Sequence, residues 1–175
     1  MWEVIILIIV LISFVLLIGT IFNNIYKLAI IKIDKAEEDI NIYLEKKEEL
    51  LDRTRPIIKK ELKLKSFLEK LDNKNDLDNF QKNDLLKNCY NELFKILDEN
   101  DKLLKSDSLN SILSNLNENE EQIVGAIKFY NDTVVDYNQL VISFPTNVIA
   151  FFKGYKKRNF YNNEKREMFD ILNEK

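Results

Sequence analysis

The feature that most constrains this chain is a long periodic segment, residues 109–145. Apolar side chains recur there every three or four residues, at Leu109, Leu113, Leu116, Ile123, Ile127, Tyr130, Val134, Tyr137, Val141 and Phe144. This spacing places them on one face of a single helix. Pro145 should stop the helix, because proline has no amide hydrogen to donate. A long helix with one apolar face needs other helices to cover that face, so the segment predicts a bundle.

The composition supports an all-helical fold, because the 175 residues include only 3 Gly and 2 Pro. Few turn residues favour long helices with short connections. We predict an all-α fold in which an N-terminal transmembrane helix precedes an antiparallel up-and-down four-helix bundle with a long fourth helix. The predicted domains are an anchor at 1–23, the bundle at 24–145, and an aromatic and basic C-terminal segment with its tail at 146–175. The predicted bundle helices span about 24–54, 56–72, 82–105 and 107–144.

Pro56 sets the predicted boundary between the first two bundle helices. The residue before a proline avoids the helical region, so the first helix should end near Arg55. Proline is also favoured as the first residue of a new helix. Four helices of alternating direction would then bring Phe144 and Pro145 back to the membrane end. A kink at Pro56 in place of a break would reverse this parity.

The segment Trp2–Phe22 is almost entirely Ile, Leu, Val and Phe, with Glu3 as its single charged residue. About 20 helical residues span about 30 Å, enough to cross a bilayer. No Lys or Arg precedes the segment and no small-x-small site follows it, so a retained anchor is favoured over a cleaved signal peptide. Lys27, Lys32 and Lys35 follow it. The positive-inside rule then predicts an outside N-terminus and a cytoplasmic bundle.

The side-chain inventory argues against an enzyme. The chain has no histidine and a single cysteine, Cys89, so the usual general base, histidine-assisted nucleophiles and zinc clusters cannot be assembled. Cys89 falls on an apolar face and is predicted to be a buried, inert thiol. We therefore expect no catalytic residues, no metal and no cofactor. The net charge of -3 gives no reason to expect a nucleic-acid partner.

Two polar features interrupt the apolar face of residues 109–145. Glu120 falls on that face, where a carboxylate needs a partner or a proton. It is either a structural polar node or, with a small drift in register, a surface side chain. Tyr130-Asn131 recurs seven residues later as Tyr137-Asn138, so both pairs face the same way. They are predicted to fix register by bonding to a second helix; the alternative is a solvated stripe of asparagines.

The chain after Pro145 combines aromatic and basic residues. Thr146 or Asn147 can cap a short helix over Val148–Phe152, which Gly154 can end. The candidate membrane-interface residues are Phe151, Phe152, Lys153, Lys156, Lys157 and Arg158. Interleaved aromatic and basic side chains suit anionic lipid. The alternative is a C-terminal flap that packs its aromatic rings on the bundle and leaves its lysines in water.

Several of these motifs together resemble the LemA family. The specific run is Glu120-x-x-Ile123, Tyr130-Asn131-x-x-Val134-x-x-Tyr137-Asn138 and Phe144-Pro145-x-Asn147 with Ala150, and an earlier run is Asp39-Ile40-x-Ile42-x-Leu44-x-Lys46-Lys47, preceded by Asn24. The chain departs from the family pattern at Glu37, where an aromatic is usual, and at Leu51–Thr54, where the family has an Ile-Pro-Asn-Leu turn. The resemblance implies a bacterial single-pass membrane protein with a four-helix bundle of mirrored up-and-down topology. It implies no defined activity.

Two functions fit these expectations. The first is a non-enzymatic interaction or scaffold module at the bacterial membrane, whose partners are the lipid bilayer and other membrane or cytoplasmic proteins. The second is an envelope sensor whose bundle binds a small ligand or changes its helix packing, which requires a cavity near Glu120 and Tyr130. A hydrolase or metal enzyme is disfavoured by the absence of histidine and of any paired-acid motif.

Overall fold

The fold was described from a computed structural model that covers residues 1–63, 67–72 and 77–161. All regular secondary structure in the described residues is helical, which confirms the all-α part of the predicted fold. The elements are α1 (Trp2–Leu62), the 3-10 helix η1 (Glu69–Asp72), α2 (Asn79–Asp98), the 3-10 helix η2 (Leu103–Lys105), α3 (Asp107–Ile142) and α4 (Thr146–Lys153). They form two compact units. Unit 1 comprises Met1–Ala36 and Phe129–Lys175, and unit 2 comprises Glu37–Lys128.

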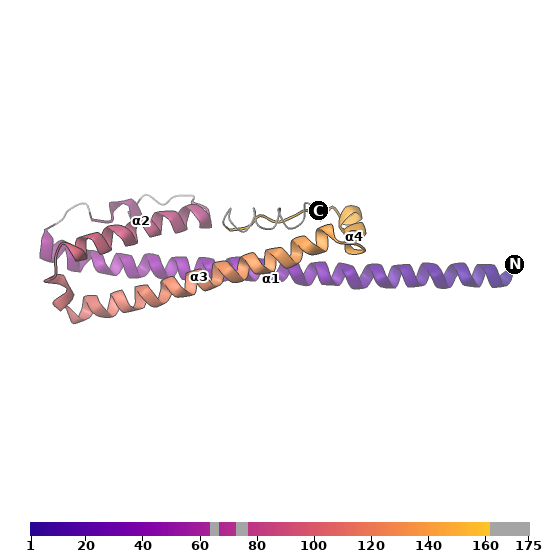
Figure 1. Ribbon diagram of the computed structural model, residues 1–175, viewed down its shortest axis with the longest axis horizontal. Helices are drawn as coiled ribbons and strands as arrows, with labels where there is room; N and C mark the ends of the chain where they lie inside the picture. Colours follow the sequence, from indigo (N-terminus) through magenta and orange to yellow (C-terminus); the bar gives the residue numbers. More distant parts are fainter. Residues whose placement is uncertain (64–66, 73–76, 162–175) are drawn as a thin grey trace. The chain divides into compact units, whose positions relative to one another are not determined.

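The helix α1 does not end at Arg55, so the predicted break at Pro56 is wrong. Figure 1 shows α1 as one uninterrupted helix, and Pro56 lies inside it, exposed to solvent. The separate helix predicted over 56–72 is also wrong: residues 56–62 belong to α1, 69–72 form η1, and 64–66 lie outside the described residues. A proline inside a helix costs about 3 kcal/mol. Burial of Thr54 and Ile58 on either side of it offsets that cost.

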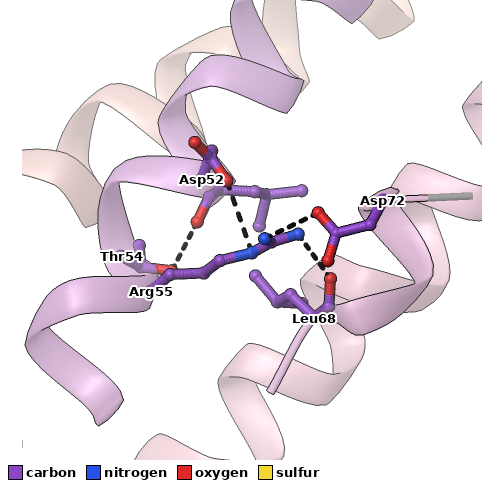
Figure 2. A network of polar contacts seen from close by, with 6 residues as sticks. Asp52, Thr54, Arg55, Leu68 and Asp72 are labelled. Atoms are coloured by element: carbon purple, nitrogen blue, oxygen red, sulfur yellow. Dashed lines mark hydrogen bonds and ion pairs between the residues drawn. The ribbon is translucent and has the colours of Figure 1, made fainter. Parts of the chain in front are cut away.

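Arg55 ties α1 to the turn that follows it. Figure 2 shows its guanidinium between α1 and η1, where Nη1 contacts Asp72 Oδ1 at 2.8 Å and Nη2 donates to the Leu68 carbonyl oxygen at 2.6 Å. Its Nε lies 3.3 Å from Asp52 Oδ1. Leu68 is fully buried with a positive φ of 56°, a conformation that costs a leucine about 1–2 kcal/mol. The charged hydrogen bond from Arg55 stabilises the strained residue and the two turns of helix beyond Pro56.

In unit 2 the second half of α1, α2 and the first half of α3 contact one another in pairs, through Lys82 and Glu48, Tyr90 and Asn117, and Asn119 and Tyr43. Its core consists of Ile40, Leu44, Leu50, Leu51, Ile58, Phe67, Leu68, Leu71, Leu86, Cys89, Leu93, Leu97, Leu103, Leu109, Ile112, Leu113, Leu116 and Ile123. Lys82, in the first turn of α2, pairs with Glu48 at 3.3 Å, 14 positions before the end of α1. The start of α2 therefore lies beside α1, well before the end of that helix.

The ends of α2 and α3 follow their capping residues. Asp78 and Gln81 form a reciprocal capping box at the start of α2. α2 ends at Asp98, earlier than the predicted residue 105, and Asn100 Nδ2 donates to the Ile96 carbonyl oxygen at 2.9 Å. That bond satisfies an orphan carbonyl at the end of the helix. Ser106 Oγ accepts from the Leu109 amide at 3.4 Å, as an N-cap side chain at the start of α3 does.

Unit 1 packs the first half of α1 against the second half of α3 and α4. Its core consists of Tyr26, Ile33, Val134, Tyr137 and Ala150. α3 ends at Ile142, close to the predicted stop at Phe144-Pro145, and the peptide bond between these two residues is cis. The core is small and rich in tyrosine, so polar contacts determine much of its geometry.

The first part of α1 carries no packed side chains. Its apolar window has a mean hydropathy of 3.3 and is 0% buried, and α1 is long and apolar enough to cross a membrane. Large apolar side chains from Trp2 to Leu17 are about half exposed or more. These residues lie within the segment 1–23 that the sequence predicts as the anchor.

Replacing Pro56 with alanine tests the continuity of α1. If Pro56 lies inside a helix, Pro56→Ala restores a hydrogen bond and removes a steric clash, so it should raise the free energy of unfolding by about 1–3 kcal/mol. Urea unfolding in mild detergent, followed by circular dichroism, measures the change. Lys60→Ala, at an exposed helical position, is the control and should change it by less than about 0.5 kcal/mol. A destabilised Pro56→Ala variant would contradict the continuous helix.

Candidate functional site

Tyr26 is the centre of unit 1. Its side chain is fully buried, its hydroxyl donates to the Leu140 carbonyl oxygen, and the Thr146 carbonyl oxygen lies 3.3 Å away. Its ring stacks on Tyr155 with centroids 4.6 Å apart and meets Tyr137 edge-on at 6.0 Å. Burial raises the pKa of both Tyr26 and Tyr137 above the ordinary value. The neutral phenol therefore joins α1 to the end of α3 and to the chain after α4.

The turn between α3 and α4 is held by Thr146, although not in the predicted way. Its hydroxyl donates to the carbonyl oxygens of Leu140 at 2.6 Å and Ser143 at 2.8 Å. Thr146 thus satisfies the orphan carbonyls of α3, and α4 has no side-chain cap at Pro145. Asn147, the other predicted cap, has a buried Oδ1 with no hydrogen-bond partner among the described residues.

Gly154 ends α4 as predicted and redirects the chain. Its φ of 71° is left-handed, and the Tyr155 amide donates to the Ala150 carbonyl oxygen at 2.9 Å. This is a Schellman arrangement, which favours glycine because a side chain is strained there. The turn brings Tyr155 onto Tyr26, and the Tyr155 hydroxyl contacts Asn23 Oδ1 at 3.3 Å. The end of α4 therefore lies beside residues 23–26 of α1.

The two asparagines of the Tyr-Asn repeat bind the backbone of the C-terminal segment. Asn138 Nδ2 donates to the Arg158 carbonyl oxygen at 3.0 Å, and Asn138 Oδ1 accepts from the Arg158 amide at 2.8 Å. Asn131 Oδ1 accepts from the Tyr161 amide at 2.8 Å. Seven helical residues advance about 10.5 Å, and three extended residues advance about 10 Å. The heptad spacing therefore matches successive attachment points on an extended segment.

The tyrosines of the repeat have two different roles. Tyr137 is buried against Tyr26, whereas Tyr130 is half-buried and its hydroxyl donates to the Asn159 carbonyl oxygen at 3.2 Å. Hydrogen bonds from Tyr130, Asn131 and Asn138 run to the backbone of residues 158–161, a partner that neither sequence-based interpretation named, whereas Tyr137 contacts a second helix, α1, through Tyr26. The polar groups of the repeat hold residues 158–161 against α3, which is a positional role.

Glu120 is ion-paired with Lys47 of α1 in unit 2. Lys47 is only 1% exposed, whereas the Glu120 side chain is 31% exposed. The Lys47 ammonium also lies 5.2 Å from the centroid of the Tyr90 ring, a cation–π distance. Asn119, the residue before Glu120, is fully buried, and its Nδ2 donates to the Tyr43 carbonyl oxygen at 3.0 Å. The pair makes Glu120 a structural polar node on the edge of the apolar face.

Phe144 of the family motif and all the residues of the predicted membrane interface are exposed. Phe144, Phe151 and Phe152 are 84%, 81% and 78% exposed, so Phe144 does not complete the buried face of α3 as predicted. Lys153, Lys156 and Lys157 are exposed as well. Arg158 differs from the rest, because Asn138 holds its backbone and its guanidinium lies 4.0 Å from Asp34.

Unit 2 also contains a groove of about 410 Å³. It is lined by Glu45, Glu48, Glu49, Asp52, Arg55, Leu71 and Asp72. Across the part of the chain that the structure describes, no three acidic or cysteine side chains form a group that could hold a metal ion. Cys89 is buried as predicted, and burial raises the pKa of its thiol. A neutral, buried thiol is a poor nucleophile.

Sequence reasoning did not identify Tyr26, Lys47 or Tyr155. Lys47 carried a signal, because it lies three residues after Leu44 and four before Leu51 on the apolar stripe of α1. A lysine at such a position needs a carboxylate across the interface. Tyr155 lies in the sequence between Lys153 and Lys156, two of the predicted membrane-interface residues. Its contact with Tyr26 spans more than a hundred residues, and no local pattern predicts it.

Truncating Glu120 tests the ion pair. Glu120→Ala leaves the buried Lys47 charge without a carboxylate, so it should lower the free energy of unfolding by about 2–4 kcal/mol. Lys47→Met keeps a similar volume without a charge and should change it by less than about 1 kcal/mol. Urea unfolding measures both, with Glu121→Ala at an exposed neighbouring position as the control. If Glu120→Ala and Lys47→Met lowered the free energy of unfolding equally, the unpaired buried charge of Lys47 would not be the cause of the loss.

Truncating Asn138 tests attachment of the C-terminal segment. Asn138→Ala removes both hydrogen bonds to Arg158 and should loosen residues 156–158, which have no regular secondary structure and lie between the attachments at Tyr155 and Tyr161. Limited trypsin digestion should then cut faster after Lys156, Lys157 and Arg158. Asp136→Ala, an exposed substitution on α3, is the matched control. Unchanged cleavage in Asn138→Ala would show that the asparagine does not hold the segment.

Comparison with known proteins identifies the family. The family model described as LemA family matches residues 36–171, a range that includes both the Lys47–Glu120 pair and the two Tyr-Asn pairs. Searches of the curated proteins and of the solved structures returned no match. The matched range covers most of the chain, and the chain therefore belongs to the LemA family.

Proposed function

We propose that this chain is a single-pass protein of the bacterial cell membrane whose folded units serve as a non-enzymatic interaction or scaffold module. The N-terminus lies outside and the folded units lie in the cytoplasm, as the lysines after the apolar segment indicate. The observation that carries the proposal is the continuity of α1. The same helix has an unpacked apolar part and supplies buried residues to both units.

The exposed apolar part of α1 supports a lipid partner. Its side chains contact no core, and each large apolar side chain left in water forgoes about 1.5–3 kcal/mol of burial free energy. A bilayer provides that burial for a helix about 30 Å long. Because α1 continues into the folded units without a flexible linker, a signal or load on those units would be transmitted to the bilayer through regular helix.

The placement of polar groups supports a structural role over catalysis. Asn138 and Asn131 are bonded to the chain's own backbone, Glu120 to Lys47, and Tyr26 to carbonyl oxygens. A catalytic site needs a nucleophile beside a base in a cleft. The envelope-sensor interpretation requires a cavity near Glu120 and Tyr130. The groove described above is lined by other residues, so it does not support that interpretation, which stays a prediction.

Disrupting the apolar segment tests the membrane assignment. The full chain should stay in the membrane pellet after an alkaline carbonate wash. The triple variant Leu7→Lys, Leu11→Lys, Val15→Lys should leave it, because each lysine costs about 2.5–3.5 kcal/mol at the centre of a spanning helix. Lys27→Gln, Lys32→Gln, Lys35→Gln is the matched control, which should remain membrane-bound and change only the orientation. A soluble full chain would contradict the proposal.

Crosslinking tests the interaction module. A photo-activated crosslinker placed on the exposed side chains Glu45 or Glu49, with the protein in native membranes, should give discrete adducts with other proteins that survive washing. A chain that stays monomeric at both positions, while remaining folded and membrane-bound, would contradict a scaffold role.

A further inference from the structure

We propose that α4 forms a second membrane contact, in which Phe144, Phe151 and Phe152 insert into the interface of the same bilayer that α1 crosses. This inference rests on the proposed membrane anchoring and names a lipid-binding surface of the folded part. It commits to the bilayer as the occupant. Three observations carry it: the large apolar side chains that α4 exposes, its position beside the anchor, and the charge around it.

The outward face of α4 exposes more large apolar side chains than an ordinary surface helix does. Its inward face carries Thr146, Ile149 and Ala150, which are buried or partly buried at the core of unit 1. Its outward face carries Val148, Phe151 and Phe152, at positions i, i+3 and i+4, and these are exposed. A surface helix in water normally presents polar and charged side chains on that face.

Phe144 is a third exposed phenylalanine, two residues before the start of α4 at Thr146. It is the most exposed of the three. The rings of Phe151 and Phe152 meet edge-on with centroids 5.6 Å apart, so they form one continuous surface rather than isolated side chains. A contiguous apolar patch of this kind on a small protein marks a binding surface.

The position of α4 identifies the bilayer as the partner. Tyr155, directly after Gly154, bonds to Asn23 and stacks on Tyr26. Asn23 follows Phe22, the last residue of the apolar segment of α1. The exposed phenylalanines are thus attached at the level where α1 leaves the hydrocarbon, which is where interfacial aromatic side chains reside.

The charges around the patch match an anionic lipid surface. Lys153 ends α4, and Lys156 follows two residues after Gly154; both are exposed. Lys27 of α1 is exposed one turn beyond Asn23. Lysines beside inserted aromatic rings are attracted to the anionic headgroups by about 1 kcal/mol each near the surface. No acidic residue occurs between Ser143 and Asn159 to oppose them.

Site-specific fluorescence in lipid vesicles tests the proposal on the full chain. Single cysteines for an environment-sensitive probe are introduced in a Cys89→Ala background as Phe151→Cys, Leu11→Cys and Lys35→Cys. The protein is reconstituted in phosphatidylcholine vesicles with and without phosphatidylglycerol. Leu11 reports the anchor, and exposed Lys35 lies about 20 Å along α1 from Phe22. Lipids that carry a nitroxide near the headgroup serve as quenchers for position 151, and lipids that carry it deep in the acyl chain serve as quenchers for position 11.

The proposal predicts blue-shifted, lipid-quenched emission at positions 11 and 151 and water-like emission at position 35. Quenching at 151 should increase with phosphatidylglycerol, and Lys153→Gln, Lys156→Gln should remove that increase. Quenching at 11 with water-like emission at 151 would overturn this inference and leave the anchoring intact. A blue shift at 151 without lipid quenching would also overturn it, because a protein partner or a second copy would then cover the patch. Unquenched emission at 11 would overturn the anchoring as well.

Discussion

The structure of unit 1 depends on one reciprocal hydrogen-bond pair, in which the side-chain amide of Asn138 pairs with the backbone of Arg158. The Asn138 side chain donates to the Arg158 carbonyl oxygen and accepts from the Arg158 amide, as the backbone of a neighbouring β-strand would. It satisfies backbone groups that have no helix or sheet to bond to. Because residues 155–161 are fixed there, Tyr155 stays stacked on Tyr26, and α4 stays beside the end of the apolar segment.

The continuity of α1 is the second constraint, and it persists in spite of local sequence preference. Pro56 disfavours a helix by about 3 kcal/mol, and the chain compensates through Arg55, which bonds to Leu68 and Asp72 beyond the helix end. Each charged hydrogen bond contributes about 1.5–3 kcal/mol. A bond of this kind to a buried, strained leucine therefore offsets much of the proline penalty. Lys47 is a second unfavourable residue that a charged partner compensates, because its ion pair with Glu120 stabilises the buried ammonium.

Much of the fold follows from periodicity, because the spacing of Ile33, Ala36, Ile40 and Leu44 on α1 and of Leu109, Leu116 and Val134 on α3 directly reflects burial. The break predicted at Pro56 failed because tertiary contacts through Arg55 override a local preference. The Tyr-Asn repeat was recognised as structural, but its partner was not. An asparagine amide fits a helix, a solvent shell or a backbone equally well, and sequence spacing does not distinguish them until the path of residues 155–161 is known.

Hydrogen exchange of the full chain in lipid nanodiscs, resolved to single amides, tests the central claim most directly. The amides of Arg158 and Tyr161 lie in a segment without regular structure, yet each donates to an asparagine side chain of α3. The account predicts that both exchange slowly, with protection comparable to neighbouring helical amides of α3, while the exposed Lys156 amide exchanges fast. Exchange of Arg158 and Tyr161 at the rate of an unstructured peptide would contradict it.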